Sequence, residues 1–150
     1  MKFLNTAKRF VAMCLVALAC SQVSVAGVVV NDTLKSEILK SDVPLCIYLP
    51  DGFQRNPQQT YPVLYLLHGM NGTNKDWADR GHLKDVMDQL RAAGEVCDMI
   101  VISPNAGGPI GEGYWNGYFD TEGWAYERFF YEEFLPTVEK QYRIKGDKAN

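Results

Sequence analysis

The segment of residues 61–73, Tyr-Pro-Val-Leu-Tyr-Leu-Leu-His-Gly-Met-Asn-Gly-Thr, constrains the fold more than any other part of the chain. Residues 63–67 form a continuous apolar run, which predicts a strand buried on both faces. The His-Gly turn after it predicts a polar loop whose backbone N–H groups face outward, where they could stabilise an oxyanion. From these residues alone, a core strand followed by a plain polar loop remains the alternative.

The sequence after this loop predicts a βαβ unit. Apolar residues share one face of a helix expected over about residues 82–93: Leu83, Val86, Met87 and Leu90. Gly94 then occupies the position of a C-terminal glycine, and residues 99–102 predict a second buried strand. A strand, a helix and a strand of these lengths imply parallel pairing in a sheet covered on both faces.

The flanking segments extend this pattern. Residues 27–60 predict an antiparallel hairpin, with turn chemistry at 31–33 and strands at 34–39 and 43–49. A second helix is expected over about 124–142, kinked or restarted at Pro136. The predicted fold class is α/β, an open half of a doubly wound sheet in which antiparallel leading strands precede the βαβ unit.

Residues 1–26 predict a secretory signal peptide. A basic n-region (Lys2, Lys8 and Arg9) precedes an apolar h-region at 10–19, and small residues at 24–26 form a cleavage site. The apolar run is too short to span a bilayer comfortably. We expect export to the periplasm or the extracellular space, with lipoprotein processing at Cys20 and membrane anchoring as the alternative.

Charge and cysteine content exclude several classes of function. Removal of residues 1–26 leaves 12 basic against 18 acidic residues, a net charge of −6. This balance argues against nucleic-acid binding and against a polybasic membrane patch. Cys46 and Cys97 remain; an oxidising compartment would permit a disulfide, but two buried thiols on separate strands is the favoured interpretation. No Cys or His pair has zinc-ligand spacing, and we expect neither a metal nor a cofactor.

Four motifs occur in an order typical of one enzyme family. They are Ile-Tyr-Leu-Pro-Asp-Gly at 47–52, the strand and loop at 61–69, Ile-Ser-Pro-Asn at 102–105 and Phe-Leu-Pro-Thr-Val-Glu-Lys-Gln-Tyr-Arg at 134–143. Together with Asp76-Trp77, they resemble the secreted putative-esterase branch of the α/β-hydrolases, which includes feruloyl and acetylxylan esterases, S-formylglutathione hydrolase and mycolyltransferases. The resemblance covers residues 34–150. It implies a partial α/β-hydrolase domain at 27–150 and an ester substrate, either an acylated plant polysaccharide or a small acyl ester.

The catalytic triad of such enzymes is missing from this sequence. The family places its serine in a G-x-S-x-G elbow after the next strand, and the sequence has no such motif. Its two histidines are His68 and His82. We therefore expect an N-terminal fragment of a serine esterase, truncated before the nucleophile strand and inactive alone. A noncatalytic carbohydrate- or partner-binding module and an acyltransferase parent are the alternatives.

The resemblance assigns roles within the loop after residue 67. The Met70 backbone N–H corresponds to an oxyanion donor, worth on the order of 3 kcal/mol in the transition state, and Gly69 allows the turn. Asn71 is a candidate substrate contact. His68 is expected to hydrogen-bond neighbouring loops instead of acting as a general base, and His82 is expected to be solvated.

Four further residues are candidates for structural or binding roles. We expect Trp77 to pack the loop onto the sheet and Asp76 to cap or tie it. Tyr114 and Trp115 are expected to line a cleft for an aromatic acyl group or a sugar ring. The alternative is a loop that folds its own aromatic cluster onto the core.

Overall fold

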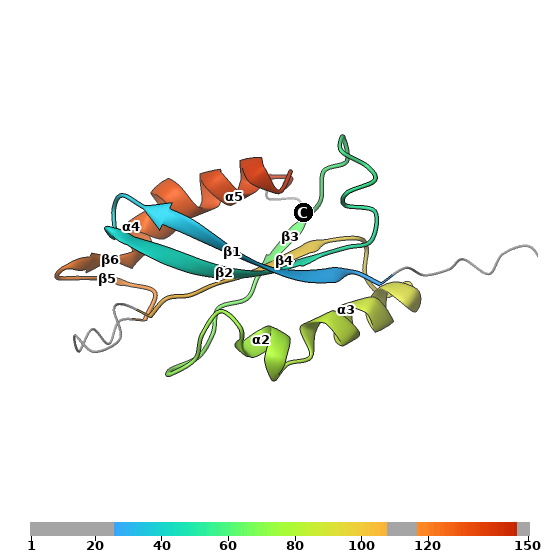
Figure 1. The fold of residues 1–150 in the computed structure, drawn as a ribbon, viewed down its shortest axis with the longest axis horizontal. Helices are drawn as coiled ribbons and strands as arrows, with labels where there is room; N and C mark the ends of the chain where they lie inside the picture. Colours follow the sequence, from blue (N-terminus) through green and yellow to red (C-terminus); the bar gives the residue numbers. More distant parts are fainter. Residues whose placement is uncertain (1–25, 108–116, 147–150) are drawn as a thin grey trace, which may run out of the picture.

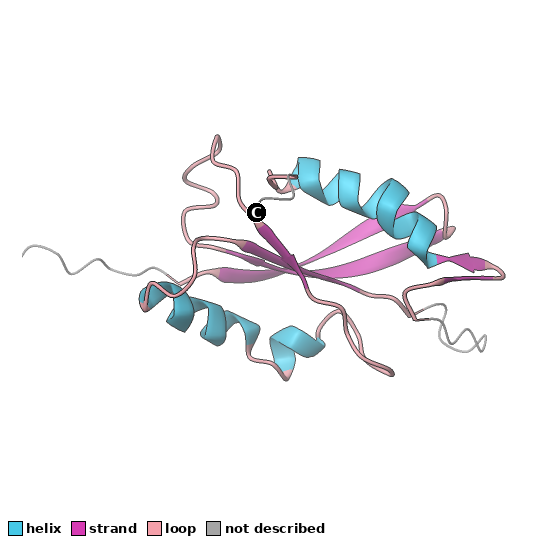
Figure 2. Ribbon diagram, turned by 180° about the vertical axis from the view of Figure 1, so that it is seen from behind, coloured by secondary structure: helices cyan, strands magenta, loops and turns pink. Residues whose placement is uncertain are grey.

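The computed structural model describes residues 26–107 and 117–146 and contains a four-stranded mixed sheet between two helical layers (Figures 1 and 2). The strands are β1 (Val28–Ser36), β2 (Ser41–Leu49), β3 (Val63–Tyr65) and β4 (Ile100–Pro104). Their order is β1-β2-β4-β3. The β1–β2 and β2–β4 pairs are antiparallel, and β3 pairs with β4 in parallel. The predicted arrangement of antiparallel leading strands followed by a βαβ unit is confirmed.

Helices cover both faces of this sheet (Figure 2). One layer comprises α2 (Asp76–Asp79) and α3 (Leu83–Ala92), and the other comprises α4 (Tyr126–Phe129), the π-helical turn η1 (Phe130–Phe134) and α5 (Leu135–Gln141). A separate small hairpin pairs β5 (Asp120–Thr121) with β6 (Trp124–Ala125). The helix predicted over 82–93 is confirmed as α3, and Gly94 ends it with φ +71°.

Alternating side chains of the central strands build one core on each face of the sheet. Ile100 and Ile102 of β4 belong to the larger core, which includes Tyr126, Phe129 and Phe134. Val101, between them, faces the opposite side and packs with the residues Tyr48, Leu83 and Met87. Because every residue of β4 is buried, this strand has the continuous apolar character expected of a strand covered on both faces.

The helix predicted over 124–142 restarts at Pro136, as expected. Pro136 has no N–H to donate to the carbonyl of residue 132, and the backbone widens into η1 immediately before α5. The wider turn keeps Phe129 and Phe134, five residues apart, on the buried side. Aromatic packing against the sheet therefore continues through the irregular turn.

The turn predicted at residues 31–33 is wrong, because β1 runs straight through it. Asp32 lies in this strand, and its carboxylate accepts hydrogen bonds from the Tyr142 hydroxyl (2.5 Å) and the Gln141 amide (2.8 Å) of the last helical segment. Polar residues that usually favour turns are tolerated here, since β1 is an edge strand with a partly exposed face.

The turn of the hairpin lies instead at residues 37–40. The carboxylate of Glu133, in η1, accepts hydrogen bonds from the backbone N–H groups of Glu37 and Ile38, both at 3.1 Å, and from the Ser36 hydroxyl at 2.5 Å. A helix distant in sequence thus holds the hairpin turn in place.

The prediction that the strand at 63–67 is buried on both faces is also wrong. Leu64 and Leu67 are 43% and 41% exposed, because β3 is the edge strand on the side opposite β1. Within the described residues, a neighbour on the outer side is found just before β3, at Tyr61. Tyr61 forms a parallel bridge with Ile144, in which the Lys145 N–H donates to the Tyr61 carbonyl at 2.9 Å. The chain after α5 therefore returns alongside β3.

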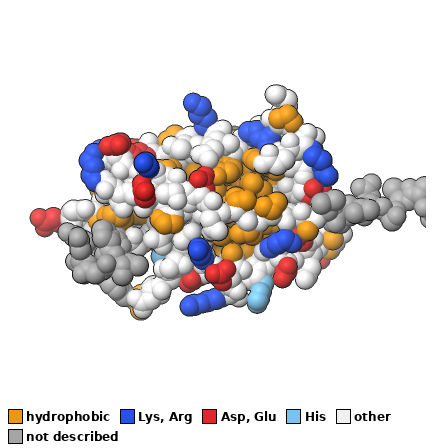
Figure 3. Space-filling model, in the orientation of Figure 1, with side chains coloured by type: hydrophobic (Ala, Val, Ile, Leu, Met, Phe, Trp, Pro, Cys, Tyr) orange, Lys and Arg blue, Asp and Glu red, His pale blue; other side chains and the backbone are white. Residues whose placement is uncertain are grey.

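Apolar surface also remains near the opposite edge of the sheet. Figure 3 shows hydrophobic side chains gathered in the middle of the face on which β1 lies in Figure 1, with charged side chains around them. Val28 in this strand is 46% exposed. Within residues 26–107 and 117–146, no helix has the length and apolar character needed to cross a bilayer.

Both described cysteines are free thiols, and they differ in burial. Cys46 is buried in β2, and desolvation raises the pKa of its thiol. Cys97 is exposed in the loop between α3 and β4, outside any strand. The expectation of two buried thiols on separate strands is therefore wrong for Cys97, whose apolar sequence neighbours belong to a short connection.

Candidate active site at the carboxyl ends of β3 and β4

Two loops meet where the parallel strands β3 and β4 end. The loop at 68–73 follows β3, and Asn105 and Ala106 follow β4. The carboxyl ends of parallel strands lie at one edge of a sheet, where α/β proteins commonly bind ligands. The buried Tyr126 of α4 donates its hydroxyl to the Asn105 carbonyl at 3.2 Å and fixes the second loop from the side of the core.

His68 bridges these two loops through its ring. The Ala106 N–H donates to His68 Nε2 at 2.9 Å, and His68 Nδ1 lies 2.9 Å from the Gly69 carbonyl oxygen. A carbonyl only accepts and a backbone N–H only donates, so the proton belongs on Nδ1. Both ring nitrogens are therefore occupied by loop contacts, and neither is free to take a proton from a nucleophile.

Tyr118 holds the main chain of the same residue. Its hydroxyl donates to the His68 carbonyl at 2.9 Å, and its ring lies 5.6 Å from the His68 ring and 5.5 Å from the Tyr126 ring. Desolvation raises the pKa of Tyr118 to about 12, although the bond to the His68 carbonyl opposes this shift. The hydroxyl therefore remains a proton donor at neutral pH.

Residues 69–72 form a tight turn at the tip of the loop. The Gly72 N–H donates to the Gly69 carbonyl at 3.0 Å, and Asn71 has φ +60°, as the third residue of a type II turn requires. A Cβ at residue 72 would lie 2.6 Å from an Asp76 carboxylate oxygen. Position 72 therefore requires glycine for steric reasons. Position 69 does not, because the space around a Cβ there is open. The Asn-Gly dipeptide signals this turn, and sequence reasoning missed it.

Met70 is exposed on this turn and is the residue predicted to donate an N–H to an oxyanion. Its side chain is 74% exposed, and within the described ranges 26–107 and 117–146 its N–H takes part in no hydrogen bond. A backbone group that stabilises an oxyanion must be free of other partners and held by a rigid frame. The Gly69–Gly72 turn supplies such a frame.

Asp76 and Trp77 tie the rest of the loop to the sheet end. The Trp77 indole N–H donates to the Leu67 carbonyl at 3.1 Å, although the residue is 41% exposed. Asp76 accepts from the Thr73 hydroxyl at 3.3 Å and lies 3.9 Å from the Arg80 guanidinium. Both side chains therefore contact protein groups of the loop, in positions that leave the turn at 69–72 exposed.

The remaining candidates lie at the margins of this site. Tyr114 and Trp115 fall outside the described residues, so their placement in a cleft stays a prediction. Asn71 is exposed at the tip of the turn, and His82 is exposed at the start of α3. Over the part of the chain that the structure describes, no three His, Cys, Asp or Glu side chains converge as a metal site requires.

The family follows from comparison with known proteins. Residues 36–150 match the family described as Putative esterase. The chain belongs to this esterase family. The endo-1,4-beta-xylanase/feruloyl esterase of Xylanibacter ruminicola is 33% identical over an alignment of 109 positions that covers 69% of this chain and 14% of that protein.

Solved esterase structures share the fold. A ferulic acid esterase is 57% identical, with a TM-score of 0.76, over 81% of this chain and 45% of its own. A ferulic acid esterase of Anaeromyces mucronatus, in complex with ferulic acid, is 20% identical, with a TM-score of 0.64, over 85% of this chain and 47% of its own, and supports the fold alone. The chain therefore has a partial α/β-hydrolase fold and spans less than half the length of each of these relatives.

Replacement of Tyr118 by phenylalanine tests the loop contacts of this candidate site. The His68 carbonyl would lose its hydroxyl donor, so we expect the free energy of unfolding to fall by about 0.5–1.5 kcal/mol in urea denaturation. Tyr131→Phe is the matched control, because Tyr131 is 64% exposed, and it should leave stability unchanged. Equal stability of the two variants would contradict a stabilising bond at His68.

Proposed function

We propose that this chain supplies the oxyanion loop of an exported serine esterase that hydrolyses carboxylic esters. The observation that carries the proposal is Met70, which is exposed on the turn after β3 and whose N–H takes part in no hydrogen bond among the described residues. An oxyanion develops on the substrate carbonyl when a nucleophile adds, and a positioned N–H stabilises that charge more than it stabilises the ground state.

His68 acts in this proposal as a positioning residue. Its ring binds the Ala106 N–H and the Gly69 carbonyl, and its own carbonyl binds Tyr118. These contacts orient the peptide that leads into Met70. Asp76 and Trp77 restrain the other end of the loop through the Thr73 hydroxyl and the Leu67 carbonyl.

The serine nucleophile is proposed to lie beyond residue 150, on a strand next to β3. The isolated parallel bridge between Tyr61 and Ile144 supports this placement, since the chain there already runs along the outer side of the segment that leads into β3. A serine elbow at the carboxyl end of that strand would be next to the loop at 68–73. In this proposal the 150-residue chain lacks the triad and is inactive by itself.

The proposed substrate is an acyl group on a plant polysaccharide or a small acyl ester. The likeness to feruloyl and ferulic acid esterases supports this class. Tyr114, Trp115 and Asn71 are proposed to contact the substrate. A signal peptide at 1–26 would direct export, lipidation at Cys20 would be the route to membrane attachment, and the acidic mature chain is proposed to bind no nucleic acid.

Ester hydrolysis by two forms of the protein tests this function. The 150-residue chain should release no product from p-nitrophenyl acetate or methyl ferulate, whereas the product of the gene read beyond codon 150 should contain a G-x-S-x-G motif and hydrolyse both. Turnover that co-purifies with the 150-residue chain would contradict the proposal. Glycan binding by that chain, lost in Trp115→Ala, would favour the noncatalytic module instead.

A further inference from the structure

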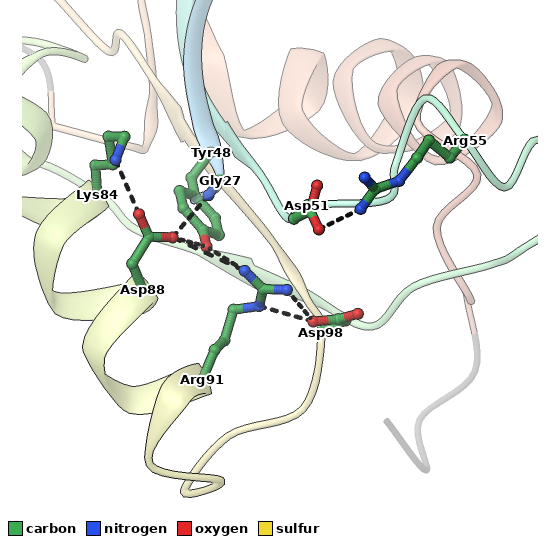
Figure 4. A network of polar contacts seen from close by, with 8 residues as sticks. All are labelled: Gly27, Tyr48, Asp51, Arg55, Lys84, Asp88, Arg91 and Asp98. Carbon is green, nitrogen blue, oxygen red and sulfur yellow. Dashed lines mark hydrogen bonds and ion pairs between the residues drawn. The ribbon is translucent and has the colours of Figure 1, made fainter. Parts of the chain in front are cut away.

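Gly27 enters the fold at a charged cluster between β2 and α3 (Figure 4). Its N–H donates to Asp88 Oδ1 at 2.8 Å. Gly27 is buried, whereas Ala26 is exposed. The bond between these two residues is also where the predicted signal peptide would be cleaved, so the buried nitrogen is the atom that cleavage would release.

Only glycine fits at this position. A Cβ at residue 27 would lie 2.5 Å from the ring and the hydroxyl oxygen of Tyr48. Tyr48 cannot easily move, because it is fully buried and its hydroxyl donates to Asp88 Oδ1 at 2.9 Å. The nitrogen of Gly27, just before β1, and the hydroxyl of Tyr48, in β2, thus reach the same carboxylate oxygen, as Figure 4 shows.

The charges around Asp88 leave Oδ1 available to a cation. Lys84 Nζ binds the other oxygen, Oδ2, at 2.9 Å. Arg91 lies 3.8 Å from Oδ1 but pairs more closely with Asp98, at 2.6 Å. Burial acts to raise the pKa of Asp88, but hydrogen bonds from Lys84, Gly27 and Tyr48 outweigh it and the pKa is lowered. Asp88 is therefore a carboxylate at neutral pH.

We propose that Asp88 and Tyr48 form a binding site for the mature N-terminus of this protein, the α-ammonium group of Gly27. Hydrolysis of the Ala26–Gly27 peptide bond by a signal peptidase consumes one water, leaves a carboxylate on Ala26 and frees an amine that takes up a proton. The amide hydrogen bond to Asp88 then becomes an ammonium–carboxylate bond, which is the stronger type.

This arrangement makes stability depend on cleavage and on pH. An α-amine that gains a carboxylate partner has a raised pKa in the folded state, against an ordinary value of about 7.7–8.0. The added stability is present in full below that ordinary value and is lost as pH rises through the folded-state value. The positive charges of Lys84 and Arg91 repel the ammonium group and act to lower its pKa. Arg91 is itself paired with Asp98, and the Asp88 carboxylate is in direct contact with the Gly27 nitrogen. Tyr48 stays neutral, since burial raises its pKa to about 12.

The first test is the N-terminal residue of the exported protein. The full chain is produced in a bacterial secretion host, and the mass of the processed product is measured. We expect a product that begins at Gly27. A product that begins at lipid-modified Cys20, or at any residue other than Gly27, would overturn the proposal.

The second test is the proton affinity of the α-amine in that product. In protein carrying ¹⁵N-glycine, NMR titration should give a proton affinity about tenfold higher than in the Asp88→Asn variant, one pKa unit. Asp85→Asn is the matched control, since Asp85 lies on the same helix and is exposed, and it should resemble the unsubstituted protein. Equal affinities in all three proteins would overturn the proposal.

A comparison that needs no substitution covers the case in which Asp88→Asn does not fold. The α-amine of the unsubstituted mature protein is acetylated, and its thermal stability is compared with that of the free-amine form. We expect the free-amine form to be more stable at pH 6, with the difference disappearing at high pH. An equal melting temperature at pH 6 would overturn the proposal, and none of these tests depends on esterase activity.

Discussion

Under the proposed function, replacement of Met70 by proline is expected to lower kcat of the complete enzyme by about 10²–10³-fold, the cost of removing one oxyanion donor. Proline has no N–H, and Met70 is the second residue of the turn closed by the Gly72 N–H and the Gly69 carbonyl. Type I and type II turns favour proline at that position, so the loop should keep its shape. The measurement is kcat for p-nitrophenyl acetate with the longer form of the protein that is proposed to contain the serine.

Met70→Ala is the matched control, because it keeps the N–H and removes only a side chain that is 74% exposed. We expect kcat of this variant to stay within about threefold of the unsubstituted enzyme, a difference of well under 1 kcal/mol. Full activity of Met70→Pro would show that the donor is another group. A similar loss in both variants would assign the effect to the side chain.

Replacement of Phe134 by alanine is expected to reduce the free energy of unfolding by about 3–5 kcal/mol. Phe134 is fully buried, and its ring lies 5.0 Å from that of Phe130 and 5.6 Å from that of Tyr65. The loss would be a large fraction of the stability of a typical domain, about 5–15 kcal/mol. Urea denaturation followed by circular dichroism measures it.

Tyr131→Ala provides the comparison for this core substitution. Tyr131 also lies in η1, but it is 64% exposed and, among the described residues, its one aromatic neighbour is Phe130. We expect a loss of about 1 kcal/mol, the size of one aromatic pair. A loss from Phe134→Ala no larger than that from Tyr131→Ala would contradict the packing of η1 against the sheet.

Periodicity in the sequence was sufficient to predict the elements with strong patterns. The helical spacing of Leu83 and Met87 gave α3, and the apolar run at 99–102 gave β4, because burial on a defined face imposes these periods. The parallel pairing of β3 with β4 followed from the length of the connection. The family motifs located the loop at 68–73, although hydrophobicity by itself could not distinguish it from a plain turn.

The errors arose where tertiary contacts override local preference. Asp32 belongs to a turn-forming tripeptide, but Tyr142 and Gln141 use its carboxylate within a strand. Leu64 belongs to an apolar run, but strand order leaves β3 at an edge. In the candidate site, the contact between Ala106 and His68 joins residues 38 apart in the sequence through a backbone N–H. No local pattern carries information of this kind.

The bonds from Glu133 to the hairpin turn have a consequence for the order in which the chain can fold. The β1–β2 hairpin is local and emerges early in synthesis, but the carboxylate that binds its turn lies 95–97 residues later. The carboxylate of Asp32, in β1, likewise accepts a hydrogen bond from the Tyr142 hydroxyl, 110 residues later. Contacts over such separations form late, since long loops must close first. The turn of the first hairpin is therefore completed only when η1 has formed, and nascent chains that end before Glu133 should leave that hairpin open to exchange with solvent.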